Sequence, residues 1–164
     1  MPEAEAVVGQ LRRRLDPAAQ QGVPPHITVL FPFAAPETIA PAIMAAVRAA
    51  ISRFEPFSFE LPEAARFPET LYLRPVPSAP FAALTRALAA AFPDFPPYGG
   101  EFSDIIPHLT VAHGSPRELD SAHTELLSAL FAHGSPRSTC RALDLIENTS
   151  GRWRLVQQIP LGSP

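Results

Sequence analysis

Two short segments of the chain carry the same pattern, a proline followed by His-x-Thr inside an apolar run. They span residues 25–29 and 107–111, and their histidines, His26 and His108, lie 82 positions apart (108 − 26 = 82). In an extended strand, residues i and i+2 project from the same face. Each segment is therefore predicted to present an imidazole beside a threonine hydroxyl, and the pair of segments to form one symmetric site.

The elements around the two motifs are predicted to occur twice in the same order. Apolar spacing and helix-forming residues predict helices over 4–15, 37–52, 78–92 and 117–131. Alternating, β-branched and aromatic residues predict strands over 26–31, 57–61, 70–74, 107–112, 138–147 and 153–160. Each half is thus helix, His-x-Thr strand, helix and two strands. The pattern predicts an α+β fold, one domain over 1–164 with an internal duplication at about 1–77 and 78–164.

Length and composition favour a soluble protein. The chain has 164 residues, enough for one domain, and contains no apolar run near the ~20 residues that a membrane helix needs. Cys140 is the single cysteine, so no internal disulfide can form. The acidic start lacks the basic-then-apolar order of a secretory signal. A cytoplasmic monomer is the expectation.

All 13 basic residues are arginine, because the sequence contains no lysine. This excludes ligases that work through a lysyl-nucleotide intermediate, Schiff-base enzymes and the lysine-dependent phosphate loop. The net charge of −3 also argues against broad non-specific binding to nucleic acid, which needs many cationic phosphate contacts. A short substrate in a locally positive groove is compatible with this charge.

The paired motifs suit attack on a phosphodiester. Two imidazoles that face one substrate can act as base and acid in the same turnover, because the free pKa of histidine lies near neutrality. The hydroxyls of Thr28 and Thr110 can donate hydrogen bonds to non-bridging phosphate oxygens. No cofactor is required for this chemistry.

Three other interpretations compete with it. Histidine and threonine also occupy the outward faces of half-buried strands for no reason beyond their polarity. A metal site is disfavoured because His108 and His113 are an odd number of positions apart and should face opposite sides of a strand, and because Cys140 has no cysteine or histidine partner nearby in sequence. A Ser-His-Asp triad lacks a nucleophile-elbow motif.

With paired His-x-Thr motifs about eighty residues apart on a duplicated α+β chain, the sequence resembles the 2H phosphoesterase superfamily, in its bacterial branch called 2′-5′ RNA ligase-like. The resemblance implies two lobes, each an antiparallel sheet with helices outside, around a groove where the motif strands lie side by side. It implies that His26, Thr28, His108 and Thr110 line that groove. It also implies an enzyme that needs neither metal nor ATP and acts on cyclic phosphates of RNA ends or small nucleotides, or joins RNA 2′-5′.

One departure from the resemblance concerns the start of the chain. Similar proteins usually begin with a strand ahead of the first helix, whereas this sequence opens almost directly on residues 4–15. If that strand is missing, one sheet is expected to end in an unpaired edge.

Residues outside the motifs give weaker signals. Tyr98, in the Gly/Pro loop before the second motif, is a candidate for stacking on a base, and Arg74, on the polar face of its strand, is a candidate phosphate contact. Packing and solvation explain the two residues equally well. The basic run Arg12, Arg13 and Arg14 is predicted to be a solvated helix face.

The leading functional hypothesis is a cyclic phosphodiesterase in which His26 and His108 share the base and acid roles. ATP-independent RNA ligation and a non-catalytic module that binds a phosphorylated ligand are the alternatives.

Overall fold

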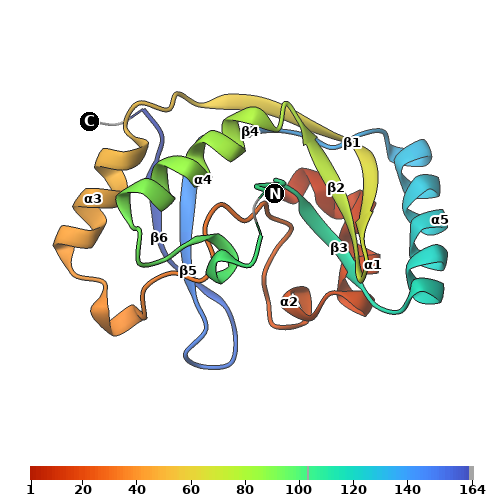
Figure 1. Ribbon diagram of the computed structural model, residues 1–164. Helices are drawn as coiled ribbons and strands as arrows, with labels where there is room; N and C mark the ends of the chain where they lie inside the picture. The colour runs from red at the N-terminus through yellow and green to blue at the C-terminus, as the bar shows by residue number, and fades with distance from the viewer. Residues whose placement is uncertain (103, 163–164) are drawn as a thin grey trace.

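A computed structural model describes residues 1–102 and 104–162 of the protein (Figure 1). Its helices are α1 (Glu5–Leu15), α2 (Pro17–Gln20), α3 (Pro41–Ile51), α4 (Ala79–Ala91) and α5 (Pro116–His133), with 3-10 turns at Pro2–Ala4, Pro36–Thr38 and Pro97–Gly100. Its strands are β1 (Phe57–Phe67), β2 (Thr70–Val76), β3 (Leu109–His113), β4 (Arg137–Cys140), β5 (Ala142–Glu147) and β6 (Arg154–Pro160). The expected helices are present, and the strand expected over 138–147 is divided into β4 and β5 at Arg141.

The larger sheet is antiparallel and has the strand order β3-β2-β1-β4. β1 reaches both neighbours because residues 57–60 pair with β4, whereas Glu60 and residues 63–67 pair with β2. Leu71, Leu73 and Leu109 are fully buried on the face that α1 and α5 cover. The opposite face of the same strands is therefore available for polar side chains.

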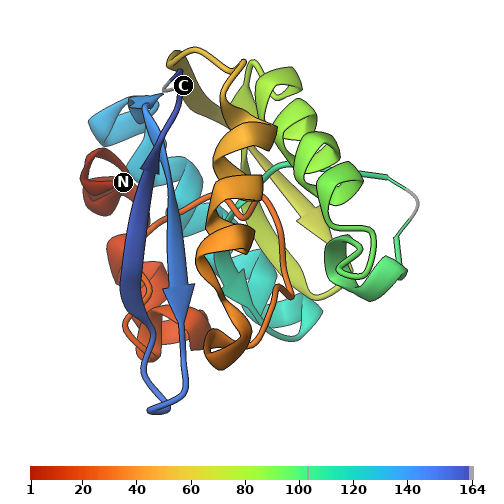
Figure 2. The ribbon, with the colours of Figure 1, turned by 90° about the vertical axis from the view of Figure 1, so that its left-hand side faces the viewer.

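β5 and β6 form a separate two-stranded antiparallel sheet. Leu143, Leu145 and Ile159 from these strands pack with α3 and α4 into a second core. Figure 2 shows the β5–β6 hairpin in blue beside α3 in orange. Phe57 and Cys140, which pair across β1 and β4, contact both cores and so connect them. Two antiparallel sheets with helices outside are thus confirmed.

The two cores do not follow the two halves of the sequence. The hairpin β1–β2, from the first half, shares its sheet with β3 and β4 from the second half. Likewise α1 packs against α5, and α3 packs against α4. Each core is built from elements of both halves, and the internal duplication over 1–77 and 78–164 stays a prediction.

The strand expected over residues 26–31 is wrong, because that segment joins no sheet. Its β-branched and aromatic residues favour extended backbone, but a strand also needs a neighbour that takes its backbone hydrogen bonds. The two motif segments are therefore not paired strands of one sheet, because β3 is an edge strand whose one partner in the described residues is β2. That both segments border one groove stays a prediction. The small β5–β6 sheet likewise gains no third strand within these residues.

Within the described ranges, no helix combines the length and the hydropathy needed to cross a membrane.

Candidate functional site

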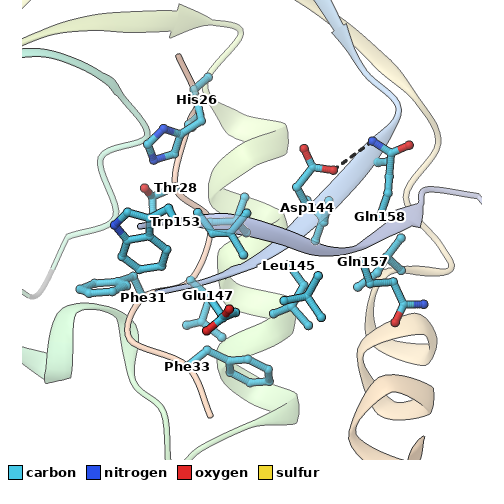
Figure 3. Close-up of a pocket in the computed structure, with 18 of the residues that line it drawn as sticks. His26, Thr28, Phe31, Phe33, Asp144, Leu145, Glu147, Trp153, Gln157 and Gln158 are labelled. Carbon is cyan, nitrogen blue, oxygen red and sulfur yellow. Dashed lines mark hydrogen bonds between the residues drawn. The ribbon is translucent and has the colours of Figure 1, made fainter. Parts of the chain in front are cut away.

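A cavity of about 980 Å³ lies between the first motif and the β5–β6 sheet. It is lined by His26 and Thr28 from the motif segment, and by residues of β5, β6 and the turn between them. Figure 3 shows the His26 and Thr28 side chains on the same side of this cavity, with Trp153 next to Thr28. Cavities that hold small ligands commonly have volumes of about 300–1,000 Å³. The space is therefore large enough for a nucleotide.

His26 is held by a hydrogen bond between its Nδ1 and the backbone carbonyl of Pro24, at 3.0 Å. In the neutral ring Nδ1 donates this bond, which leaves the lone pair of Nε2 available to a substrate. Burial lowers the pKa of His26 below its ordinary value of 6.5, and the carbonyl of Pro24 partly offsets this effect. The imidazole is therefore neutral at pH 7 and is suited to accept a proton.

A buried ion pair between Arg12 and Asp16 lies close enough to His26 to affect its pKa. Arg12 and Asp16 are nearly inaccessible, with side chains 3% and 1% exposed, and the Asp16 carboxylate accepts from Arg12 Nε and Nη2 at 2.9 and 2.7 Å. Arg12 lowers the pKa of His26 and Asp16 raises it, so the pair acts on the imidazole with opposite signs. The prediction of a solvated face for the basic run holds for Arg13 and Arg14 but is wrong for Arg12.

Tyr98 lies against the first motif, although it precedes the second motif in sequence. Its backbone N–H donates to the carbonyl of Phe31 at 2.6 Å. Burial raises the pKa of the Tyr98 phenol, and a hydrogen bond with Thr28 partly offsets that rise. Tyr98 also adopts a left-handed backbone conformation, with φ of 51°. The loop before β3 therefore folds back so that Tyr98 stands next to Thr28.

His108 immediately precedes β3 and sits against an aromatic pair from β1 and β2. Phe67 and Tyr72 stack with ring centroids 4.4 Å apart, and each ring centroid lies 5.2 Å from that of His108. Nδ1 of His108 is hydrogen-bonded to the carbonyl of Ile106 at 2.7 Å. Burial lowers the pKa of His108 below 6.5, and the carbonyl of Ile106 partly offsets this effect.

Thr110 lies on the same face of β3 as His108. Its partner across the strands is Tyr72, whereas Leu109 and Val111 point into the core. The alternation breaks at a bulge, because Tyr72 pairs with Thr110 while Leu71 pairs with Ala112. Val111 is the extra residue, and both it and Ala112 are fully buried.

The bulge corrects the expectation that His108 and His113 face opposite sides. His113 pairs with Thr70, two residues before Tyr72, so it shares the face of Thr110. The Thr70 hydroxyl and His113 Nδ1 are 3.0 Å apart. Counting alternate residues predicts the wrong face beyond a bulge, because the extra residue has no partner on the neighbouring strand. Among the described residues, no group of three His, Cys, Asp or Glu side chains is arranged to hold a metal.

The remaining candidate, Arg74, is exposed on β2 and pairs with Glu63 on β1, with Nη1 and Oε2 3.6 Å apart. It stands two residues from Tyr72 and so on the same face as Thr110. The six candidates fall into two sets. His26, Thr28 and Tyr98 gather at the first motif, and His108, Thr110 and Arg74 gather on the sheet face; the lining of the cavity includes only His26 and Thr28.

The two motifs share one local geometry. Each imidazole uses Nδ1 to hold the carbonyl of the residue two positions before it, at Pro24 and at Ile106. Each is also desolvated, which lowers its pKa. Ile27, between His26 and Thr28, packs on the core that contains Leu109 and thereby ties the first motif to the sheet of the second.

Sequence reasoning missed four aromatic residues around these motifs. Trp153 and Phe31 line the cavity beside Thr28, and Phe67 and Tyr72 flank His108. The signal available in the sequence was weak, because aromatic residues in strands are most often part of the core. Only their contacts with the motif residues or the cavity in the folded chain separate them from packing residues.

Comparison with known proteins gives one family match. The family model described as "2'-5' RNA ligase superfamily" matches residues 1–152 of the chain. A search of curated proteins finds no match.

Proposed function

Because this chain belongs to the 2'-5' RNA ligase superfamily, we propose that it opens 2′,3′-cyclic phosphates of RNA ends or small nucleotides, with His26 and His108 as general base and acid. Membership of the superfamily supports a phosphoesterase or ligase-like activity. The finer assignment of substrate and residues is the proposal. The observation that carries it is the matched hydrogen bond from Nδ1 of each histidine to a carbonyl two residues before it.

That hydrogen bond fixes the tautomer that the reaction needs. When Nδ1 donates to a carbonyl, Nε2 of the neutral ring is an acceptor and Nε2 of the charged ring is a donor. One histidine therefore takes a proton through Nε2 while the other gives a proton through Nε2. The same local structure serves both roles, which is why the geometry alone leaves the two assignments interchangeable.

The reaction then follows an in-line course. The neutral histidine removes a proton from water as the water oxygen attacks phosphorus, and the bond from phosphorus to one ribose oxygen breaks. The protonated histidine delivers its proton to that leaving oxygen, so the product is a nucleoside monophosphate. Thr28 and Thr110 donate hydrogen bonds to the non-bridging oxygens, where negative charge builds up in the transition state. Exchange with solvent restores both protonation states.

Ligation uses the same groups with a different nucleophile. If a ribose 5′-hydroxyl replaces water, the attack on phosphorus joins two RNA ends and requires no ATP. The name of the matching superfamily supports ligation as a second candidate activity. Ligation requires that two RNA ends be bound at once, and the negative net charge of the chain disfavours this.

The test is incubation with the four 2′,3′-cyclic nucleotides in EDTA, with products separated by chromatography. The proposal expects monophosphates from the wild type and none from a His26→Ala/His108→Ala double variant. Saturable binding without product from the wild type would contradict the proposal and favour a binding module. A parallel reaction with an RNA cyclic-phosphate end and a 5′-hydroxyl end, without ATP, distinguishes ligation from hydrolysis.

A further inference from the structure

Two aromatic side chains stand in the cavity next to the first motif. Phe31 is 49% exposed, an unusual position for a phenylalanine, and Trp153 is half-buried. Their ring centroids are 6.4 Å apart with an interplanar angle of 62°. Figure 3 shows the Trp153 indole between Thr28 and Phe31. The two rings therefore border the place where the phosphate would contact Thr28.

Backbone and side-chain contacts hold Trp153 in this position. The backbone N–H of Trp153 donates to the backbone carbonyl of Gln21 at 3.0 Å, and Asn148 Nδ2 donates to Gln21 Oε1 at 2.9 Å. These bonds fasten both ends of the β5–β6 turn to the segment before the first motif. The indole is thus placed before a ligand arrives, which reduces the entropy lost on binding.

The turn is also fixed from within. Glu147 is buried at the end of β5 and accepts hydrogen bonds from the backbone N–H and the hydroxyl of Thr149, at 2.7 and 2.5 Å, and from Arg154. These contacts lower the pKa of Glu147 to about 2. The carboxylate is therefore charged throughout the neutral range, where it accepts these hydrogen bonds within the turn that carries Trp153.

Phe31 is anchored from the opposite side. Its carbonyl accepts from Tyr98 N–H, and the Tyr98 ring in turn contacts Phe102, which is 64% exposed, at 5.8 Å between centroids. Tyr98 and Phe102 thus form a second aromatic pair next to the segment that carries Phe31. The rings of Phe31 and Trp153 provide flat apolar surface on which a base can stack.

We propose that Phe31 and Trp153 form a stacking subsite for the nucleobase of the substrate. The inference rests on the proposed function, which it deepens: the enzyme acts on nucleotides or RNA ends and discriminates against cyclic phosphates that carry no base. Every base has a π-face, so stacking on these rings tolerates any of the four bases. The phosphate is bound by the motif residues and not by the aromatic rings.

Intrinsic fluorescence tests binding without any turnover, because Trp153 is the single tryptophan of the chain. Adenosine 3′-monophosphate should quench its emission saturably, whereas ribose 5-phosphate at the same concentrations should not. Equal responses to the two compounds, or no response to the nucleotide, would overturn the stacking subsite.

Kinetics provide a second readout. Trp153→Ala should raise KM for 2′,3′-cyclic AMP by about 5- to 100-fold, the range expected for the loss of one stacked base, with a much smaller effect on kcat. Trp153→Phe should restore most of the affinity. Phe131→Ala serves as the control, since Phe131 is 94% exposed on α5, far from the β5–β6 sheet in Figure 1.

Glycerol 1,2-cyclic phosphate separates this inference from the proposed function. It has the cyclic phosphodiester but no base, so the subsite predicts poor saturation by this compound and a KM that Trp153→Ala changes far less. If both cyclic phosphates are opened equally well, the stacking subsite is wrong and the phosphodiesterase stands. If neither is opened but the nucleotide still quenches Trp153, the phosphodiesterase is wrong and the subsite stands.

Discussion

Arg12 and Asp16 form a two-point ion pair beneath the first motif, and both side chains are almost completely removed from solvent. Asp16 also caps α2 by accepting from the backbone N–H of Ala18 at 2.9 Å. One carboxylate thus links the last turn of α1 to the start of α2, in the segment that precedes His26.

Loss of Arg12 should destabilise the protein strongly. Arg12→Ala leaves the Asp16 carboxylate buried with no cationic partner, which costs about 3–5 kcal/mol of the free energy of unfolding. Arg13→Ala, one position along the same helix, removes an exposed ion pair with Glu5 and should cost less than about 1 kcal/mol. Urea unfolding of both variants checks this, and equal losses would show that the buried pair is not a structural requirement.

The start of α5 depends on a capping box. The Ser115 hydroxyl accepts from Glu118 N–H, and the Glu118 carboxylate accepts from the backbone N–H of Ser115 at 2.9 Å. Ser115→Ala should lower the free energy of unfolding by about 1 kcal/mol. Ser128→Ala, at an exposed position of the same helix, should change it by less than about 0.5 kcal/mol. Thermal unfolding gives both values; a Ser115 variant as stable as the Ser128 variant would mean that the cap contributes nothing.

Such local signals explain which parts of the fold the sequence predicts well. The cap at Ser115, the stop at Gly134 with its φ of 77°, and the alternation in β1 and β2 depend on neighbours in the chain. The bulge at Val111 and the unpaired state of residues 26–31 depend on which strands meet in space. Periodicity alone carries no information about either of these features.

The candidate site also has parts that the sequence predicts and parts that depend on which segments meet in the folded chain. His26 with Thr28 and His108 with Thr110 are recognisable as repeated motifs. The contact of Tyr98 with the first motif, and the presence of Trp153 in the cavity, join segments separated by about seventy or more residues. Burial of Arg12 likewise depends on the position of Asp16 one helical turn away, and on how α1 packs in the folded protein.

The activity should have its maximum below neutral pH. Burial lowers the pKa of both His26 and His108 below 6.5. Catalysis requires one neutral and one protonated histidine, and the proton of the acid is lost as pH rises through these lowered values. The profile of kcat/KM should therefore peak below pH 6.5 and fall toward pH 8. A profile that rises steadily to pH 8 would contradict the two-histidine assignment in the free enzyme.

Cys140 should be a poor nucleophile in the folded protein. Burial raises the pKa of its thiol to about 11, and the thiolate is the reactive form. Alkylation by iodoacetamide at pH 8 should be more than about tenfold slower in the native protein than in urea. Comparable rates in the two conditions would show that the thiol is accessible and reactive in the folded protein.

The most direct test of the central claim is the turnover of each single variant, His26→Ala and His108→Ala, on a 2′,3′-cyclic nucleotide in EDTA. Each should lose about 10²–10⁴ in kcat while its unfolding curve stays close to that of the wild type. His133→Ala, an exposed histidine at the end of α5, should retain full turnover. Wild-type turnover in either motif variant would contradict the proposal that the two histidines act together on one phosphate.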